Sequence, residues 1–73
     1  MDKTDYDNEL LVAMRTASGL TQEQVAEEVG VKRLTIIRVE QGESASFDLL
    51  KRLTRVYGKP ITAVLRVHDT AVA

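Results

Sequence analysis

The sequence predicts a small all-α domain, a compact bundle of four helices with a helix-turn-helix at its centre, followed by one C-terminal β-strand. Its 73 residues are enough for one domain with a modest core. Residues 22–41 have the pattern of two short helices joined by a tight turn. Apolar residues on either side of this segment recur at helical spacing, and only residues 61–68 alternate as a strand does.

The central segment, QEQVAEEVGVKRLTIIRVEQ, carries the strongest signal. Ala26 is small enough to let two helices approach closely, and Gly30 suits a turn with a positive φ. Val31, Ile36 and Val39 follow at spacings that point inward from the turn and from the second helix. This combination is typical of a helix-turn-helix, whose second helix can enter the major groove of DNA.

Capping residues and glycines set the expected ends of the four helices. We expect the first from about Asn8 to Ala17, and a Thr21–Gln24 capping box at the start of the second. The third should begin around Lys32–Arg33 and stop at Gly42, and the fourth should run from about Phe47 to Tyr57 after a Ser46 cap. The residues that we expect to point inward are Leu11, Met14, Val25, Ala26, Val29, Ile36, Val39, Leu50, Leu53 and Val56 or Tyr57.

The run after Pro60 predicts the C-terminal strand, because it is rich in β-branched residues and alternates. A short fifth helix that packs through Val64 and Leu65 is the alternative. A lone strand leaves backbone groups unpaired, so we expect it to pair with the same strand of a second copy in a homodimer. The predicted dimer interface consists of Ile61, Ala63, Leu65 and Val67.

Composition excludes several classes of protein. The absence of cysteine excludes disulfides and thiolate metal sites and favours a reducing compartment. His68 has no second ligand beside it, so we expect neither a metal nor a cofactor. No apolar run approaches the roughly 20 residues that cross a bilayer, and the acidic start MDKTDYDNE is unlike a secretory signal. We therefore predict a cytoplasmic protein with no membrane partner, associated with the nucleoid when it binds DNA.

Charge is unevenly distributed along the chain. The formal net charge of −1 and the isoelectric point near 5.7 are unlike the basic balance of many DNA-binding proteins. However, acidic residues load the N-terminus, whereas Lys32, Arg33 and Arg38 cluster on the third helix. Local potential, not net charge, meets the phosphates, so this helix remains a candidate for DNA binding.

The third helix separates cleanly on a helical wheel. Ile36 and Val39 fall on one side, and the other side carries Arg33, Leu34, Ile37 and Arg38. Arginine pairs well with guanine, and apolar side chains contact thymine methyl groups, so we predict that these four residues contact bases. The alternatives are two solvated surface arginines and, for the apolar pair, a wider core stripe or a dimer surface.

Three segments together resemble the lambda-repressor-like (Cro/cI, Xre) family of helix-turn-helix domains: GLTQEQVAEEVGV at 19–31, TIIRVEQGE at 35–43 and SFDLLKRLTRVYG at 46–58. The resemblance implies a compact helical bundle that binds operator DNA, usually as a dimer. It also implies a partly buried ion pair between Arg15 and Glu40. The predicted phosphate contacts are Gln22, Lys32, Thr35 and Gln41. The predicted division is an acidic N-terminal arm at 1–7, a DNA-binding domain at 8–58, a dimerisation strand at 59–68 and a frayed tail at 69–73.

The sequence departs from the family pattern at three positions. Lys32 stands where a serine or threonine usually caps the third helix, so a cap is exchanged for a cation. Glu43 stands where a basic residue often approaches the DNA backbone, so we expect the following loop to add little affinity. The usual proline before Ser46 is missing, which leaves the entry angle of the fourth helix open.

These patterns predict a sequence-specific DNA-binding repressor and not an enzyme. The serines have no plausible histidine and acid partners, and there is no glycine loop that would cradle a phosphate. A chain this small leaves no room for a sensing domain, so we expect repression by occupation of a promoter. The alternative is an antitoxin that binds a toxin protein and also regulates its own operon. A purely structural adaptor would leave the cationic helix face unexplained.

Overall fold

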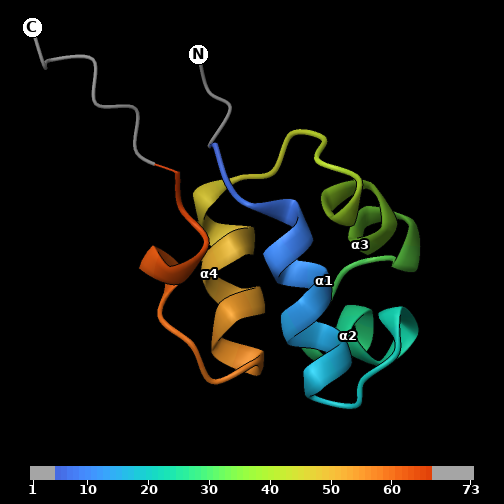
Figure 1. The fold of residues 1–73 in the computed structure, drawn as a ribbon. Helices are drawn as coiled ribbons and strands as arrows, with labels where there is room; N and C mark the ends of the chain where they lie inside the picture. The colour runs from blue at the N-terminus through green and yellow to red at the C-terminus, as the bar shows by residue number, and fades with distance from the viewer. Residues whose placement is uncertain (1–4, 67–73) are drawn as a thin grey trace, which may run out of the picture.

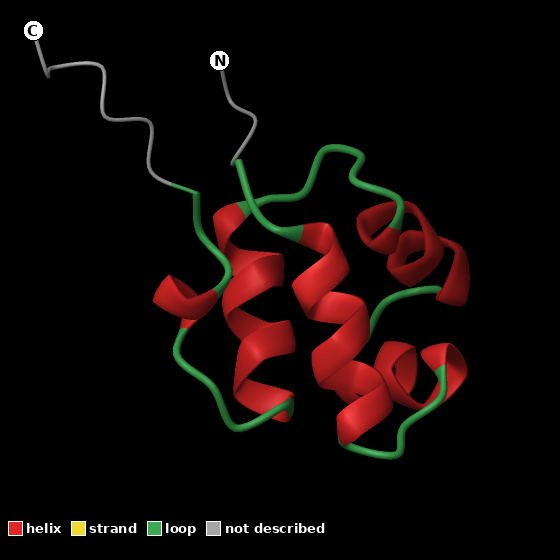
Figure 2. Ribbon diagram, viewed as in Figure 1, coloured by secondary structure: helices red, strands yellow, loops and turns green. Residues whose placement is uncertain are grey.

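The computed structural model describes residues 5–66, and its helices follow the predicted order (Figures 1 and 2). The elements are α1 (Asn8–Ala17), α2 (Gln22–Val29), α3 (Arg33–Glu40), α4 (Phe47–Val56) and one 3-10 turn, η1 (Ile61–Ala63). α2 packs against both α3 and α4, and α1 packs against α3. Among the described residues, none of the helices has the length and apolar character needed to cross a membrane.

Side-chain caps fix where three of the four helices begin. The Asp7 carboxylate accepts a backbone N–H from the first turn of α1, and the Ser46 hydroxyl does the same for α4. The predicted capping box at α2 is confirmed: Thr21 Oγ1 accepts the Gln24 N–H at 3.0 Å, and Gln24 Oε1 accepts the Thr21 N–H at 2.9 Å. At α3 the N-cap residue is Lys32, whose side chain makes no capping hydrogen bond.

Gly30 makes the turn between α2 and α3. It has a left-handed backbone with φ of 77°, which costs glycine little and other residues more. The N–H groups of Gly30 and Val31 both donate to the carbonyl oxygen of Ala26, at 2.9 and 3.0 Å, and so close the end of α2. The predicted helix-turn-helix is therefore confirmed in its geometry.

One apolar core joins all four helices. Its buried side chains are Tyr6, Leu11, Met14, Val25, Ala26, Val29, Ile36, Val39, Ala45, Leu50, Leu53, Tyr57 and Val64. The inward positions predicted for the helices are buried. Of the two candidates at the end of α4, Tyr57 is buried and Val56 is only partly buried. Two of the core residues, Tyr6 and Val64, come from segments that the sequence pattern assigns to an arm and to a strand.

Residues 5–7 lie within the fold, although the predicted acidic arm included them. The Tyr6 side chain is 5% exposed and belongs to the core. The Asp7 N–H donates to the carbonyl oxygen of Val64 at 2.7 Å, and the Arg66 N–H donates to that of Asp5 at 3.0 Å. The segment before α1 is thus bound to the segment after η1.

The prediction of a C-terminal β-strand is wrong over the residues that the structure describes. Ile61–Ala63 forms a 3-10 turn, and Val64, expected on the opposite side from the dimer interface, is completely buried. Leu65 forms an isolated antiparallel bridge with Tyr6, so its backbone partner lies within the same chain. The alternative of a short helical segment that packs through Val64 and Leu65 is closer to this arrangement. Val67, the fourth predicted interface residue, lies outside the described residues.

Candidate nucleic-acid interface

The two faces of α3 differ as the sequence pattern predicts. Ile36 and Val39 are 1% and 2% exposed and lie in the core. Arg33 and Arg38 are exposed, and Leu34 is 51% exposed; within residues 5–66, Phe47 on α4 is the other large apolar side chain that is exposed. Ile37, the fourth predicted base contact, is partly buried at the border between the faces.

The exposed face of α3 is cationic because Glu40, the one acidic residue of this helix, is paired with a residue of α1. Within residues 5–66, Lys32, Arg33 and Arg38 take part in no ion pair. The carboxylate of Glu40, at the end of the same helix, is paired with Arg15 of α1. The cations on α3 therefore keep their charge available to an outside partner, although the whole chain is slightly acidic.

The four predicted phosphate contacts lie along the helix-turn-helix. Lys32 and Gln41 are exposed at the two ends of α3, and Thr35 is partly buried between them. Gln22 is partly buried at the first position of α2. All four belong to elements that adjoin the exposed face of α3.

Two open hollows bring several of these residues together. One, of about 640 Å³, lies between the starts of α2 and α3, and Gln22, Arg33 and Arg15 are among its lining residues. The other, of about 580 Å³, lies beside the C-terminal half of α3 and is lined by Thr35, Arg38, Val39, Glu43 and Ser44. Sequence reasoning did not foresee Arg15 in the first hollow, since only its pairing with Glu40 was expected.

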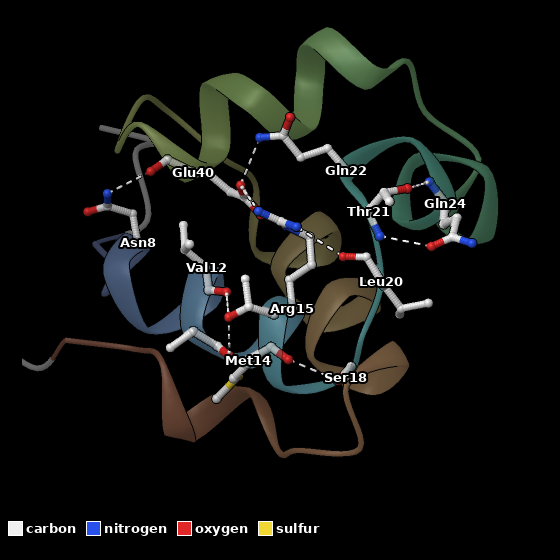
Figure 3. A network of polar contacts seen from close by, with 12 residues as sticks. Asn8, Val12, Met14, Arg15, Ser18, Leu20, Thr21, Gln22, Gln24 and Glu40 are labelled. Atoms are coloured by element: carbon white, nitrogen blue, oxygen red, sulfur yellow. Dashed lines mark hydrogen bonds and ion pairs between the residues drawn. The ribbon is translucent and has the colours of Figure 1, made fainter.

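A polar network lies behind this surface and joins three helices (Figure 3). Arg15 Nε donates to Glu40 Oε2 at 2.7 Å and Arg15 Nη2 donates to Glu40 Oε1 at 3.2 Å, which confirms the ion pair that the resemblance implied. The Arg15 and Glu40 side chains are 14% and 8% exposed. The hydrogen bonds to Glu40 raise the pKa of Arg15. Gln22 Nε2 donates to Glu40 Oε1 at 3.0 Å, a contact that sequence reasoning missed.

Two residues before and at the start of α1 bind the C-terminal end of α3. The Tyr6 hydroxyl donates to the carbonyl oxygen of Val39 at 2.8 Å and also lies within hydrogen-bond distance of that of Glu43. Asn8 Nδ2 donates to the carbonyl oxygen of Glu40 at 2.8 Å. Burial, and then the charge of Glu43, raise the pKa of Tyr6. The Asn8 contact satisfies a carbonyl group that the last turn of a helix leaves free, whereas the carbonyl of Val39 also accepts the Gly42 N–H, at 3.0 Å.

Three of the predicted dimer-interface residues lie within the described chain. Ala63 is exposed, while Ile61 and Leu65 are partly buried and pack against the core. Ile61 and Ala63 belong to the 3-10 turn, so these three residues do not line one face of a strand.

Comparison with known proteins supports a helix-turn-helix assignment. A family model described as "Helix-turn-helix" matches residues 11–64. The chain is 35% identical over 92% of its length to a provisionally named HTH-type transcriptional regulatory protein of Halobacterium salinarum, and 34% identical over 88% to one of Pyrobaculum aerophilum. It spans only 21% and 26% of the lengths of those two relatives. An uncharacterised HTH-type transcriptional regulator of Methanothermobacter thermautotrophicus is 50% identical over 62% of the chain and 67% of its own length.

Proposed function

This chain belongs to the Cro/cI-like helix-turn-helix family of DNA-binding transcription regulators, and we propose that it represses transcription by binding a palindromic operator as a homodimer. The outward face of α3 carries the proposal. Arg33, Leu34 and Arg38 are exposed there, opposite the buried Ile36 and Val39. A half-exposed leucine between two arginines that form no ion pair within residues 5–66 suits a surface that meets base edges.

Direct readout is assigned to four side chains of α3. The guanidinium groups of Arg33 and Arg38 can each bond to guanine O6 and N7, and Leu34 and Ile37 can contact thymine methyl groups. Each half-site of the operator should therefore contain guanine and thymine steps. Each arginine–guanine pairing contributes on the order of 1–3 kcal/mol of discrimination against the wrong base, so a few contacts suffice for a preferred DNA sequence.

Phosphate contacts would fix the position of α3 in the groove. Lys32 and Gln41 extend from the ends of α3, and Thr35 lies between them. A phosphate in the hollow between α2 and α3 would meet Gln22 and Arg33, which line it together with Arg15 and one acid, Glu23. Such contacts supply affinity without sequence information, and they make binding depend on salt.

A homodimer would double the base contacts across two half-sites about 34 Å apart. We assign its contact to the compact segment 61–65, with Ala63 exposed at its surface, in place of strand pairing. Occupation of a promoter, including the protein's own, would then exclude polymerase. The antitoxin alternative, in which the chain binds a toxin protein and also regulates its own operon, stays a prediction.

Selection from random DNA duplexes tests the proposal. We expect the protein to enrich a palindromic sequence with guanine and thymine in each half and with half-sites one helical turn apart. Expression from a promoter that contains this sequence should fall when the protein is supplied. Failure to enrich any sequence would refute specific readout, and a rise in expression would refute repression.

Sedimentation tests the dimer separately. Ala63→Glu places a charge on the proposed contact, and Ala13→Glu places the same charge on an exposed position of α1. The first variant should sediment as a monomer at micromolar concentration and the second as a dimer. A wild-type protein that is monomeric under these conditions would contradict the homodimer.

A further inference from the structure

The orientation of the Gln22 side-chain amide is dictated by its neighbour. Gln22 Nε2 lies 3.0 Å from Glu40 Oε1, and a carboxylate paired with arginine can only accept hydrogen bonds. The amide nitrogen must therefore face Glu40. Figure 3 shows the amide oxygen of Gln22 on the side away from Glu40. One N–H of the amide is used by Glu40, and the other remains for a second acceptor.

Glu40 is itself held firmly and its charge is compensated. Arg15 donates to both of its carboxylate oxygens, at 2.7 and 3.2 Å, and the pair is largely buried. Arg15 Nη1 also donates to the carbonyl oxygen of Leu20, at 2.9 Å, in the loop that leads into α2. A carboxylate anchored at both oxygens is a fixed reference point for the amide of Gln22.

We propose that Glu40 is a positioning residue for the DNA phosphate contact: it holds the Gln22 amide so that the second N–H faces the hollow shared with Arg33. The proposal rests on the proposed function, which places a phosphate in that hollow. A donor that is already oriented loses less side-chain freedom when the phosphate binds. Because Arg15 neutralises Glu40, the carboxylate can orient the donor with little repulsion of the phosphate.

The wild-type protein without DNA provides the first test. NMR relaxation of side-chain amide groups should give Gln22 an order parameter near the rigid value of about 0.85, and the exposed Gln41 a value below about 0.6. Gln41 is the matched control because it carries the same group on the same proposed surface. If Gln22 is as mobile as Gln41, Glu40 does not position it and the proposal is overturned.

A double-mutant cycle on the selected operator provides the second test. At fixed salt, Gln22→Ala should weaken binding about tenfold in the wild-type background, the loss of one hydrogen bond to a charged group. In the Glu40→Gln background the same change should weaken binding less than about twofold, because the new side chain has one acceptor oxygen in place of two, and Arg15 competes with Gln22 for it. An equal loss in both backgrounds, or no loss in the wild type, would overturn the proposal. Should Glu40→Gln fail to fold, the relaxation measurement decides.

Arg38→Ala separates positioning from a general effect on the fold. Among the described residues, Arg38 makes no hydrogen bond or ion pair with Glu40, so its loss should weaken binding by the same factor in both backgrounds. If its effect also vanishes with Glu40→Gln, α3 no longer docks, and Glu40 has a merely structural role. A wild-type protein that enriches no operator at all would refute the proposed function instead, and the relaxation data would still report on the amide.

Discussion

Within residues 5–66, side chains of other segments form hydrogen bonds with the C-terminal end of α3, and none does so with its N-terminal end. At the C-terminal end, Tyr6, Asn8 and Arg15 all donate hydrogen bonds to the last residues of the helix or the loop after it. At the N-terminal end, Lys32 supplies no side-chain cap and Arg33 is exposed. Apart from Gln22, which binds Glu40 and is also a proposed phosphate contact, the groups that anchor the helix differ from those proposed to bind DNA, so mutations at them should separate stability from affinity.

The largest expected effect is at the anchored end. Arg15→Met should lower the free energy of unfolding by about 3–5 kcal/mol, because it leaves the Glu40 carboxylate buried without its partner. Arg52→Met is the control: its ion pair with Asp48 has side chains 56% and 69% exposed, and its hydrogen bond to the Val29 carbonyl is long, at 3.4 Å, so their loss should matter by less than about 1 kcal/mol. Urea unfolding measures both. Equal losses would mean that burial does not distinguish the two pairs.

Alkaline pH should lower the stability of the protein through Tyr57, whose hydroxyl is affected by the charge of Glu40 at the C-terminal end of α3. Burial, and then the charge of Glu40, raise the pKa of Tyr57 to about 12. The tyrosine of the unfolded chain titrates near pH 10, so between these values only the folded protein keeps the proton, and stability falls as pH rises. We expect Tyr57→Phe to reduce the loss of unfolding free energy between pH 10 and 12 by about 2 kcal/mol. An unchanged pH dependence in this variant would remove Tyr57 as the cause.

A smaller effect is expected from the hydroxyl that holds the last turn of α3. Tyr6→Phe keeps the buried ring but leaves the carbonyl oxygen of Val39 without its side-chain donor. The free energy of unfolding should fall by about 1–2 kcal/mol, and amide hydrogen exchange should quicken around residues 39–43. The anchoring role of Tyr6 would be disproved by an unchanged exchange rate there.

The smallest effect is expected at the uncapped end. Lys32→Thr should add a side-chain cap and raise the free energy of unfolding by about 0.5–1 kcal/mol. The same change should weaken operator binding and reduce the slope of its salt dependence by about one, since a phosphate contact is lost. Lys59→Thr, an identical charge change at an exposed position outside the helices, is the control. A variant that gains stability with unchanged salt dependence would exclude Lys32 from the phosphate contacts.

Local sequence signals were sufficient for the four helices and for the two faces of α3. Thr21, Gln24 and Ser46 form caps within a few residues of themselves, and the turn at Gly30 is likewise local. Periodicity separates Ile36 and Val39 from the exposed arginines because it depends only on spacing along one helix. The placement of the predicted base contacts on one outward surface followed from these signals alone, apart from Ile37, which is partly buried.

What the sequence did not reveal depends on contacts between distant residues. Alternation after Pro60 resembles a strand, but the Tyr6–Leu65 bridge and the burial of Val64 depend on packing against the opposite end of the chain. The Tyr6–Val39 hydrogen bond joins residues 33 positions apart, and Gln22–Glu40 joins residues 18 apart. No spacing rule indicates such pairs, and even the Arg15–Glu40 ion pair was expected only from the family resemblance.

Binding of the selected operator by Arg38→Ala, measured beside Arg55→Ala, tests the central claim most directly. Both arginines are exposed and both changes remove one positive charge, but Arg38 lies on the outward face of α3 and Arg55 lies on α4. Arg38→Ala should lose about 1–3 kcal/mol of binding free energy per half-site together with the preference for guanine, whereas Arg55→Ala should keep that preference. An Arg38→Ala protein that binds the operator with unchanged affinity and selectivity would contradict readout by this face of α3.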